Sequence, residues 1–389
     1  MRILHTAHVY PPRVDGVSEV VSQISTRLAK RGHEVHVASY LPAGAARSEM
    51  LNGVHVYRFD IRGDALRGMN GEVDDYLRFA ASLNWDVIVM HHAHTWNTDA
   101  LLPHLERIGA PAIFVSHGLS GFGEPVWDRY YAMLADHLRR VNHIGLSRMN
   151  EESAFCPKYG LPEPWIIPNG IDPATWCTPA IGVRERWGIG RSRWLLSVSN
   201  HTPAKNHAAI FEVVRQVRRT HRDAVGTIIG SHHPVEKWNL GRFGLKGGCW
   251  YKCCLGSMFG SAIKLKVGTP KPEVVSALKE ADMLIMTSKW EAYPLAMLEA
   301  MAAGTPWLSF DVGCTRENAG GIVVKDSGEM ARTIVDLFNN PERCRQLGEE
   351  GKAQIAARHH WETIVDRYEE YYRAVARSTP MQRLQEVTV

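Results

Sequence analysis

The sequence is short of the features that define several large classes of protein. No apolar run reaches the roughly 18 residues that span a bilayer. The N-terminus, Met-Arg-Ile-Leu-His-Thr-Ala, lacks the apolar core of a signal peptide. Neither sign of charge dominates, because 45 Lys and Arg against 41 Asp and Glu leave a net charge of only +4. We therefore expect a cytoplasmic protein with an anionic small substrate and no nucleic-acid partner. Peripheral contact with the inner face of a membrane stays open.

Cysteine is scarce and irregularly spaced. Seven cysteines, an odd number, give no disulfide framework and indicate reduced thiols in a reducing compartment. The densest group, Cys249, Cys253 and Cys254, matches no paired C-x-x-C pattern, so we interpret these three as packed or partly exposed thiols rather than metal or redox residues. The surrounding segment 238–259 mixes aromatic and basic residues. A structural insert is the preferred interpretation of it, and contact with a membrane surface or a lipid acceptor is the alternative.

The sequence contains no Asp-x-Asp pair. Such a pair is the usual carboxylate site for a divalent ion that holds a nucleotide diphosphate. Without it, the charge on a departing diphosphate would be stabilised by lysine, backbone amides and helix dipoles. We expect no metal ion and no other cofactor.

Strand and helix signals alternate along the 389 residues, which are too many for one ordinary core. Turn residues cluster from Trp165 to Pro173, and the alternation restarts at Trp194. The pattern predicts an α/β protein with two domains, residues 1–170 and 185–364, each built on a parallel sheet. A cleft between two such domains would place ligands at the carboxyl ends of the strands.

The stretch from Ser288 to Pro306 is the most informative part of the chain. It follows a short apolar strand, 283–286, and predicts a helix that opens at Pro294 and ends at Gly304. The N-terminus of this helix is an anion site because it presents unpaired amides and the positive end of the helix dipole. Glu291 stands just before it and Glu299 just over one turn inside. Two acids beside a phosphate-binding helix end indicate a ligand with both phosphates and hydroxyls, such as a sugar nucleotide.

Three further positions follow predicted strands. The turn at Gly16-Val17 lets backbone approach a ligand, although many α/β turns contain a glycine. His117 is suited to a sugar hydroxyl or a developing charge, with a histidine satisfied by loop backbone as the alternative. Lys205 has the charge to hold a diphosphate, with a solvated lysine as the alternative.

Three histidines, His91, His92 and His94, follow the strand 86–90 and look like a metal cluster. No cysteine or acid lies nearby at ligand spacing, and alternate residues of an extended segment face opposite ways. We therefore predict a structural or substrate-lining role for them.

Together these residues resemble the retaining GT-B glycosyltransferases of glycosyltransferase family 4, over nearly the whole chain. The most specific match is Glu291 to Glu299, the E-x7-E pattern of that family, followed by Ala-Met-Ala-Ala-Gly-Thr-Pro. Shorter matches support it: Asp15-Gly16-Val17, Arg31-Gly32-His33-Glu34-Val35, Ser116-His117-Gly118, Pro168-Asn169-Gly170-Ile171-Asp172 and Pro203-Ala204-Lys205-Asn206.

The resemblance implies two Rossmann-like domains, with the sugar nucleotide held mainly by the C-terminal one and the tail helix, 365–389, packing back on the N-terminal one. Glu299 would bind the ribose hydroxyls, and Glu291 would lie near the donor sugar. The stretch Ala292, Tyr293, Pro294 and Leu295 would contact sugar and phosphate through its amides. Lys205 would hold the diphosphate and His117 would contact the donor sugar, while the Gly16-Val17 turn would close over the phosphates. His117, Glu291 and Lys205 are the expected catalytic residues.

The sequence departs from the family pattern at two places. Asn200 occupies the nucleotide-sugar-binding position where the family usually carries an arginine, so one positive charge on the diphosphate is missing. Asp15 stands before Gly16 where the family often has a second glycine, which places an acid near a phosphate site.

The predicted function is metal-independent, retaining transfer of a sugar from a nucleotide-diphosphate sugar, with UDP or GDP expected, to an acceptor hydroxyl. A cell-envelope, polysaccharide or lipid-linked glycan is the expected acceptor. Two alternatives remain: a sugar-nucleotide 2-epimerase of GT-B shape, and a weakly catalytic subunit that binds sugar nucleotides.

Overall fold

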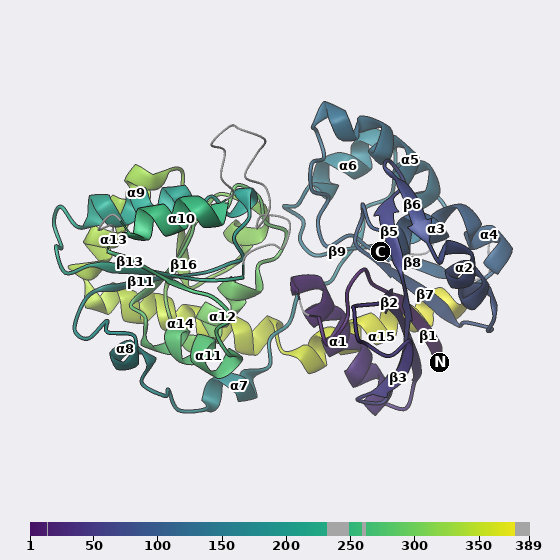
Figure 1. Cartoon of the computed structure of the whole chain (residues 1–389), viewed down its shortest axis with the longest axis horizontal. Helices are drawn as coiled ribbons and strands as arrows, with labels where there is room; N and C mark the ends of the chain where they lie inside the picture. The colour runs from purple at the N-terminus through teal and green to yellow at the C-terminus, as the bar shows by residue number, and fades with distance from the viewer. Residues whose placement is uncertain (14, 232–248, 259–261, 378–389) are drawn as a thin grey trace. The chain divides into compact units, whose positions relative to one another are not determined.

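The computed structural model describes residues 1–13, 15–231, 249–258 and 262–377, and these divide into two compact units (Figure 1). Unit 1 comprises Met1–Gly170 and Trp361–Val389, and unit 2 comprises Ile171–His360. Each unit is an α/β sandwich around its own sheet. The α/β class predicted from the sequence is confirmed in both units.

The sheet of unit 1 has eight strands in the order β10-β9-β8-β7-β1-β2-β4-β3. All neighbours are parallel except β3, which pairs antiparallel with β4. Its strands are β1 (Arg2–Thr6), β2 (Glu34–Tyr40), β3 (Ser48–Leu51), β4 (Val54–Phe59), β7 (Val87–His91), β8 (Ala112–Val115), β9 (Asn142–Gly145) and β10 (Trp165–Ile166). A separate antiparallel hairpin joins β5 (Ile61–Asp64) to β6 (Gly68–Gly71).

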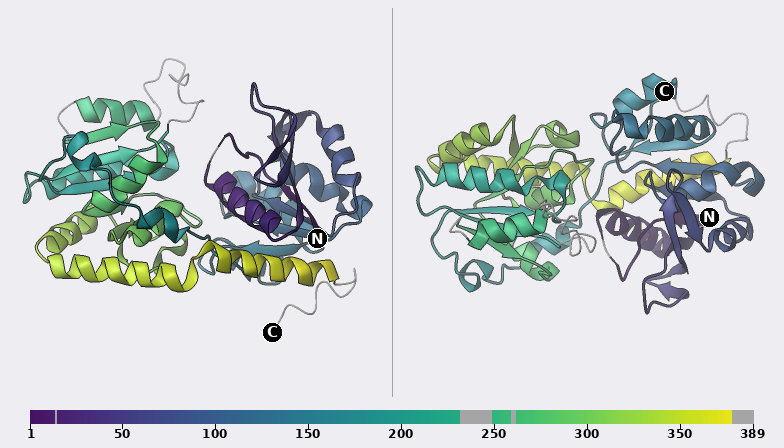
Figure 2. Two further views of the ribbon diagram at one scale, coloured as in Figure 1. Left: turned by 90° about the horizontal axis from the view of Figure 1, so that it is seen from below. Right: turned by 45° about the horizontal axis from the view of Figure 1, so that its top comes forward.

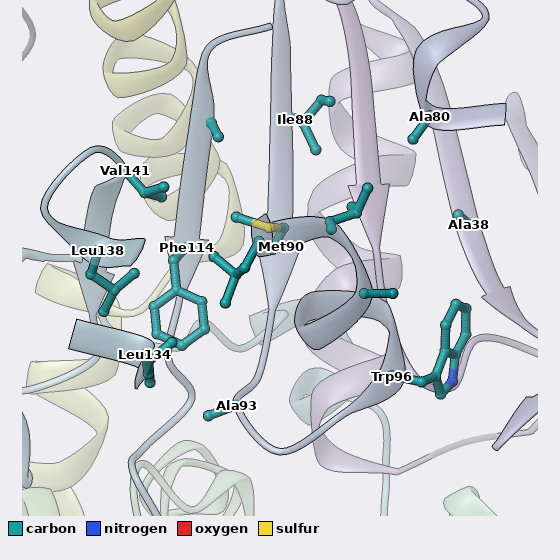
Figure 3. Packing of buried hydrophobic residues seen from close by; sticks show 14 of the residues in the cluster. Ala38, Ala80, Ile88, Met90, Ala93, Trp96, Phe114, Leu134, Leu138 and Val141 are labelled. Atoms are coloured by element: carbon teal, nitrogen blue, oxygen red, sulfur yellow. The ribbon is translucent and has the colours of Figure 1, made fainter. Parts of the chain in front are cut away.

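Helices cover both faces of this sheet because β8 is apolar at every position, β7 is apolar at every position except His91, and both strands are buried throughout. The helices are α1 (Gly16–Lys30), α2 (Val73–Ala81), α3 (Trp96–Leu101), α4 (Leu105–Ile108), α5 (Asp128–Leu138), α6 (Glu152–Tyr159) and α15 (Trp361–Arg377). Residues of α2, α3, α5 and α6 pack on the strands in one core, part of which is drawn in Figure 3. Helices α1 and α15 lie side by side, where Arg31 binds the carboxylates of Glu362 and Glu369 (Figure 2).

The sheet of unit 2 has six parallel strands in the order β13-β12-β11-β14-β15-β16. These strands are β11 (Trp194–Val198), β12 (Val225–Ile229), β13 (Ile263–Lys266), β14 (Met283–Met286), β15 (Trp307–Phe310) and β16 (Gly321–Val324). The helices are α7 (Pro173–Cys177), α8 (Val183–Arg186), α9 (His207–Val217), α10 (Cys249–Met258), α11 (Lys271–Glu280), α12 (Leu295–Ala303), α13 (Ser327–Phe338) and α14 (Pro341–Arg358). Apolar residues of α9, α10 and α13 form one core with the strands.

The sequence analysis overlooked β3 and the β5–β6 hairpin for two different physical reasons. Strand β3 is exposed and shows no alternation of apolar and polar residues. The hairpin depends on glycines: a Cβ on Gly63 would lie 2.0 Å from the carbonyl oxygen of Gly68, and one on Gly71 would lie 1.9 Å from that of Asp60. Glycine in a strand weakens the sequence signal and marks close approach of two backbones.

Candidate functional site

Lys205 and Glu291 form a close ion pair in unit 2. Nζ of Lys205 lies 2.6 Å from Oε1 of Glu291, and the same oxygen accepts a hydrogen bond of 2.6 Å from Oγ of Ser288. The lysine side chain is 26% exposed and the glutamate side chain only 9%. Water therefore screens the pair only in part, and the lysine keeps a surface that an anion can reach.

Two loops at the carboxyl edge of the sheet bring this pair together. Lys205 ends a 3-10 turn, η3 (Pro203–Lys205), that follows β11, while Glu291 follows β14, the neighbour of β11 in the sheet. Oγ1 of Thr287 donates to the carbonyl oxygens of Lys205 (3.2 Å) and Asn206 (3.1 Å). The amide of Lys289 donates to the carbonyl of Ala204 (2.8 Å). These bonds fasten the two loops to each other and fix the position from which Lys205 extends.

Helix α12 begins one residue later than predicted, because Pro294 is its N-cap, with an extended ψ of 119°. The first helical hydrogen bond runs from the amide of Met297 to the carbonyl of Pro294 (3.2 Å). Proline has no N–H, so the predicted binding stretch can offer only the amides of Ala292, Tyr293 and Leu295. The helix ends at Gly304 in the left-handed region (φ 76°), as the sequence predicts.

The side chain of Tyr293 is committed to the interior of unit 2. Its hydroxyl donates to Oδ1 of Asn318 (3.3 Å), its ring lies 5.9 Å from that of His359, and burial raises its pKa. What Tyr293 can present to a ligand is therefore its backbone amide. The loop that contains Gly313 packs tightly against the backbone of Glu291, because a Cβ on Gly313 would lie 2.0 Å from the carbonyl oxygen of Glu291.

Glu299 lies in the second turn of α12 and is 7% exposed. Its Oε1 binds the ammonium of Lys271, the first residue of α11, and the side chain of this lysine is 61% exposed. A buried carboxylate held by one exposed lysine can exchange that lysine for ligand hydroxyls without a large rearrangement. Lys271 lies outside the matched motifs, so the sequence analysis did not identify it.

Asn200 links two loops. Its Oδ1 accepts a hydrogen bond from the amide of Ser231 (3.0 Å), and the amide of His201 donates to the carbonyl of Ser231 (2.9 Å). The loop after β11 is thus tied to the end of β12. The residue that replaces the expected arginine has a positioning contact of its own.

The first turn of unit 1 is a capped helix start. Asp15 is the N-cap of α1: its Oδ1 accepts from the amide of Ser18 (2.8 Å), and Oγ of Ser18 accepts from the amide of Asp15 (2.7 Å). Oδ2 of Asp15 lies 2.9 Å from Nε2 of His8. Burial raises the pKa of Asp15, but the bonds from His8 and Ser18 outweigh it and lower that pKa to about 2. Asp15 therefore caps the helix with a charged side chain, while Gly16 is exposed and has open space around its Cα.

His117 belongs to a chain of three buried histidines. Nδ1 of His5 lies 2.9 Å from Nε2 of His91, and Nδ1 of His91 lies 2.9 Å from Nε2 of His117. Burial lowers the pKa of His5 and of His117 to about 3, and it also lowers the pKa of His91 well below its ordinary value. All three rings are therefore neutral at pH 7, and each of the two hydrogen bonds between the rings contains a single proton.

His5, at one end of this row of three histidines, determines which of the two possible proton arrangements the row adopts. Nε2 of His5 is buried and meets no hydrogen-bond partner within the described residues. A buried N–H without an acceptor is rarer and costlier than a lone pair without a donor, so His5 carries its proton on Nδ1. His91 then donates from Nδ1 to His117, and His117 carries its own proton on Nδ1. With this arrangement His117 is a hydrogen-bond donor through Nδ1, and its contact with a donor sugar stays a prediction.

The three histidines at the end of β7 have separate surroundings, and His91 is the last residue of that strand. His91 sits in the chain just described, the ring of His92 is tilted against that of His8 with ring centres 5.7 Å apart, and His94 stacks on Trp127 at 4.1 Å. Within the described residues, the only group of histidine, cysteine and acidic side chains close enough to share a metal ion is in unit 2. A structural or ligand-lining role for the three histidines stays a prediction.

No two of the seven cysteines are joined by a disulfide. Most of the segment 238–259, interpreted as an insert or a membrane contact, lies outside the described residues. Across the described part of the chain, no helix combines the length and apolar character that crossing a membrane requires.

Comparison with known proteins identifies the family. The family model Glycosyltransferase Family 4 matches residues 14–175, and the model Glycosyl transferases group 1 matches residues 183–354. N-acetyl-alpha-D-glucosaminyl L-malate synthase from Bacillus anthracis is 30% identical over 388 residues, 94% of this chain and 96% of that protein. Glycogen synthase from Mycobacterium tuberculosis is 24% identical over 421 residues, 97% of this chain and 95% of that protein.

Solved structures agree on the fold. Sucrose-phosphate synthase from Thermosynechococcus elongatus superposes with a TM-score of 0.80 at 17% identity, over 96% of this chain and 99% of that one. Anabaena HepE, in complex with UDP and glucose, has a TM-score of 0.76 at 14% identity, over 96% of this chain and 100% of that one. The chain is therefore a member of glycosyltransferase family 4, a retaining family with the GT-B fold, and it transfers a sugar from a nucleotide sugar.

Proposed function

We propose that the donor diphosphate binds at the carboxyl edge of the six-stranded sheet, between Lys205 and the N-terminus of α12. The observation that supports this proposal most strongly is the Lys205–Glu291 ion pair. Its lysine binds the carboxylate of Glu291, and the lysine side chain is still 26% exposed. The first-turn amides of α12 follow Glu291 directly in the chain. This arrangement supplies a charge, amides and a dipole for the phosphates, which is what transfer without a metal at the diphosphate requires.

In this proposal Lys205 leaves Glu291 when the diphosphate enters, and Ser288 continues to hold the carboxylate. Glu299 exchanges Lys271 for the ribose hydroxyls. Glu291 is then free to accept from a hydroxyl of the donor sugar. His117 of unit 1 donates from Nδ1 to a sugar oxygen, and the Gly16-Val17 turn offers helix-start amides to an anion.

The chemical step transfers the sugar with retention. The bond between the anomeric carbon and the diphosphate oxygen breaks, and the acceptor oxygen bonds to the same face of the sugar. The departing diphosphate takes the proton of the acceptor hydroxyl, so no separate protein base is needed. Lys205 and the α12 amides stabilise the negative charge that develops on the diphosphate.

UDP or GDP is the proposed nucleotide, and the UDP complex of Anabaena HepE supports UDP as the first choice to test. An acceptor hydroxyl on a cell-envelope, polysaccharide or lipid-linked glycan, handled at the cytoplasmic side of the membrane, completes the proposal. The relatives named above differ in their products, so the acceptor is the part of the proposal that needs the broadest screen.

The test combines binding with transfer. Thermal-shift measurements with UDP-, GDP- and ADP-sugars should show one nucleotide that raises the melting temperature, because ligand binding stabilises the folded state. Lys205→Met and Glu299→Gln should make that shift much smaller at the same nucleotide concentration, while the exposed control Lys325→Met should retain it. Transfer by the wild type should be unaffected by added Mg²⁺ or Mn²⁺. An unchanged shift in both site variants would contradict the assignment. Formation of an epimerised sugar nucleotide without acceptor would favour the epimerase alternative.

A further inference from the structure

A second cluster of reactive side chains lies beside this site in unit 2. His201 is in the loop after β11, and His207 is the first residue of α9. Cys249 and Cys253 come from α10, four positions apart and so on one face of that helix. Helix α10 packs against α9 (Figure 1), and the ligand atoms of the four side chains all lie within 4.8 Å of one another.

The separations match those of a tetrahedral metal site. Zn–N bonds of about 2.0 Å and Zn–S bonds of about 2.3 Å at tetrahedral angles place two nitrogens about 3.4 Å apart, and a nitrogen and a sulfur about 3.6 Å apart. The two Nδ1 atoms of His201 and His207 are 3.1 Å apart. Sγ of Cys249 lies 3.5 Å from Nδ1 of His207 and 4.0 Å from Nδ1 of His201, and Sγ of Cys253 lies 3.8 Å from Nδ1 of His207.

The surroundings of the cluster also fit a metal. His201, His207 and Cys253 are at most 2% exposed. Nε2 of His207 lies 2.8 Å from Oγ of Ser199, the kind of outer contact that orients a metal-bound imidazole.

We propose that His201, His207, Cys249 and Cys253 bind one zinc ion. Two thiolates and two imidazoles are a donor set that prefers zinc over magnesium, calcium or manganese. Four protein ligands close the coordination sphere, so the ion is structural and has no open position for a substrate. This differs from the expectation of no metal drawn from the sequence. The spacings His201-x5-His207 and Cys249-x3-Cys253 are common in zinc sites. The two pairs are 42 positions apart, however, and only the fold brings them together.

The zinc ion has a defined mechanical role. It joins α10 to the loop that follows β11, and its two histidines bracket Lys205 on both sides. Binding of the ion therefore fixes both ends of the segment that presents this lysine. The effect of zinc on the stability of the protein is independent of the function proposed above, whereas an effect of zinc on donor binding rests on that function.

The experiment uses the full chain, produced in zinc-supplemented medium and purified without chelators or a polyhistidine tag. Elemental analysis by mass spectrometry should find about one zinc ion per chain. Cys253→Ser should lose most of it, while Cys254→Ser, the matched neighbour outside the cluster, should retain it. Wild-type protein with far less than one zinc ion per chain would overturn the proposal, and so would equal zinc content in the two variants.

A second measurement avoids the risk that Cys253→Ser fails to fold. Wild-type protein refilled with Co²⁺ should show the intense visible bands of tetrahedral cobalt together with sulfur-to-cobalt charge transfer. Absence of these bands would refute coordination by the two cysteines. Nucleotide binding is then measured on the zinc-loaded protein. A protein with zinc that binds no nucleotide would refute the proposed function and leave the zinc site standing, whereas one that binds nucleotide without zinc would do the reverse.

Discussion

Substitutions of Lys205 and Glu291 should change nucleotide affinity in opposite directions. Lys205→Met removes the cation proposed to hold the diphosphate. Glu291→Gln removes the negative charge that lies 2.6 Å from this cation in the unliganded protein. The glutamine keeps the size of the side chain and its bond from Ser288, so the loop should keep its conformation. The account therefore expects weaker nucleotide binding from the first change and tighter binding from the second.

The size of each effect follows from the exposure of the pair. A charge-assisted hydrogen bond contributes about 1.5–3 kcal/mol, so Lys205→Met should weaken binding by about 10- to 150-fold. The side chains of the pair are 26% and 9% exposed, between a surface pair worth about 0.2–1 kcal/mol and a fully buried one. In Glu291→Gln the nucleotide no longer has to break the ion pair in order to bind, and the free energy of binding should become more favourable by about 1 kcal/mol. Glu291→Gln should therefore tighten binding by about fivefold. Sugar transfer should nevertheless fall in Glu291→Gln, because the carboxylate is the proposed contact of the donor sugar.

Isothermal titration with the nucleotide selected by thermal shift measures all three variants, the double variant included. If Glu291 acts by neutralising Lys205, Glu291→Gln should have no effect on affinity in the Lys205→Met background. The exposed pair of Arg343 and Glu350, 43% and 48% exposed, provides the control, and Glu350→Gln should leave affinity unchanged. Weaker binding by Glu291→Gln alone, or equal tightening in both backgrounds, would refute the reasoning.

Three other changes are predicted. Asp15→Ala should lower the stability of unit 1 by about 1 kcal/mol, measured by thermal denaturation, because α1 loses its N-cap, and Asp15→Asn should lose less. Acidification from about pH 6.5 to about pH 5 should lower the melting temperature. The pKa values of His5 and His117 are about 3 when folded, so the unfolded chain binds more protons in this range, at up to about 1.4 kcal/mol per pH unit for each histidine. Asp99 and Glu152, with pKa values raised by burial to about 6 and about 7, act oppositely but are outnumbered by the buried histidines, and a rising melting temperature on acidification would contradict this. Asn200→Arg should slow transfer rather than restore a missing charge, because the bond to Ser231 is lost; faster transfer would show that the bond does not matter.

The elements of the donor region could be predicted because their signals are local. A buried strand at 283–286, a proline and a glycine at the two ends of a short helix, and two acids around its start all lie within one segment. The strands β7, β8, β11 and β15 are short apolar runs, and the periodicity of α1 and α15 is clear from adjacent turns. Local steric and hydrogen-bonding preferences decide such features, so the sequence contains them.

The contacts that complete the site could not be predicted because they join distant segments. Lys205 and Glu291 were expected to hold different parts of the donor, and nothing in their spacing indicates that they bind each other. The same holds for Lys271 with Glu299. The chain of His5, His91 and His117 needs three strands to be neighbours in the sheet. Each of these contacts depends on strand order and register, which the local pattern of residues leaves undetermined.

The most direct test of the account is where the nucleotide protects the backbone from hydrogen exchange. Exchange of the full chain, measured by mass spectrometry with and without the selected nucleotide, reports each segment separately. The account predicts slower exchange in residues 200–206 and 291–299, and loss of this protection in Lys205→Met. Protection elsewhere in the chain with no change in these two segments would contradict the central claim that Lys205 and the start of α12 hold the donor.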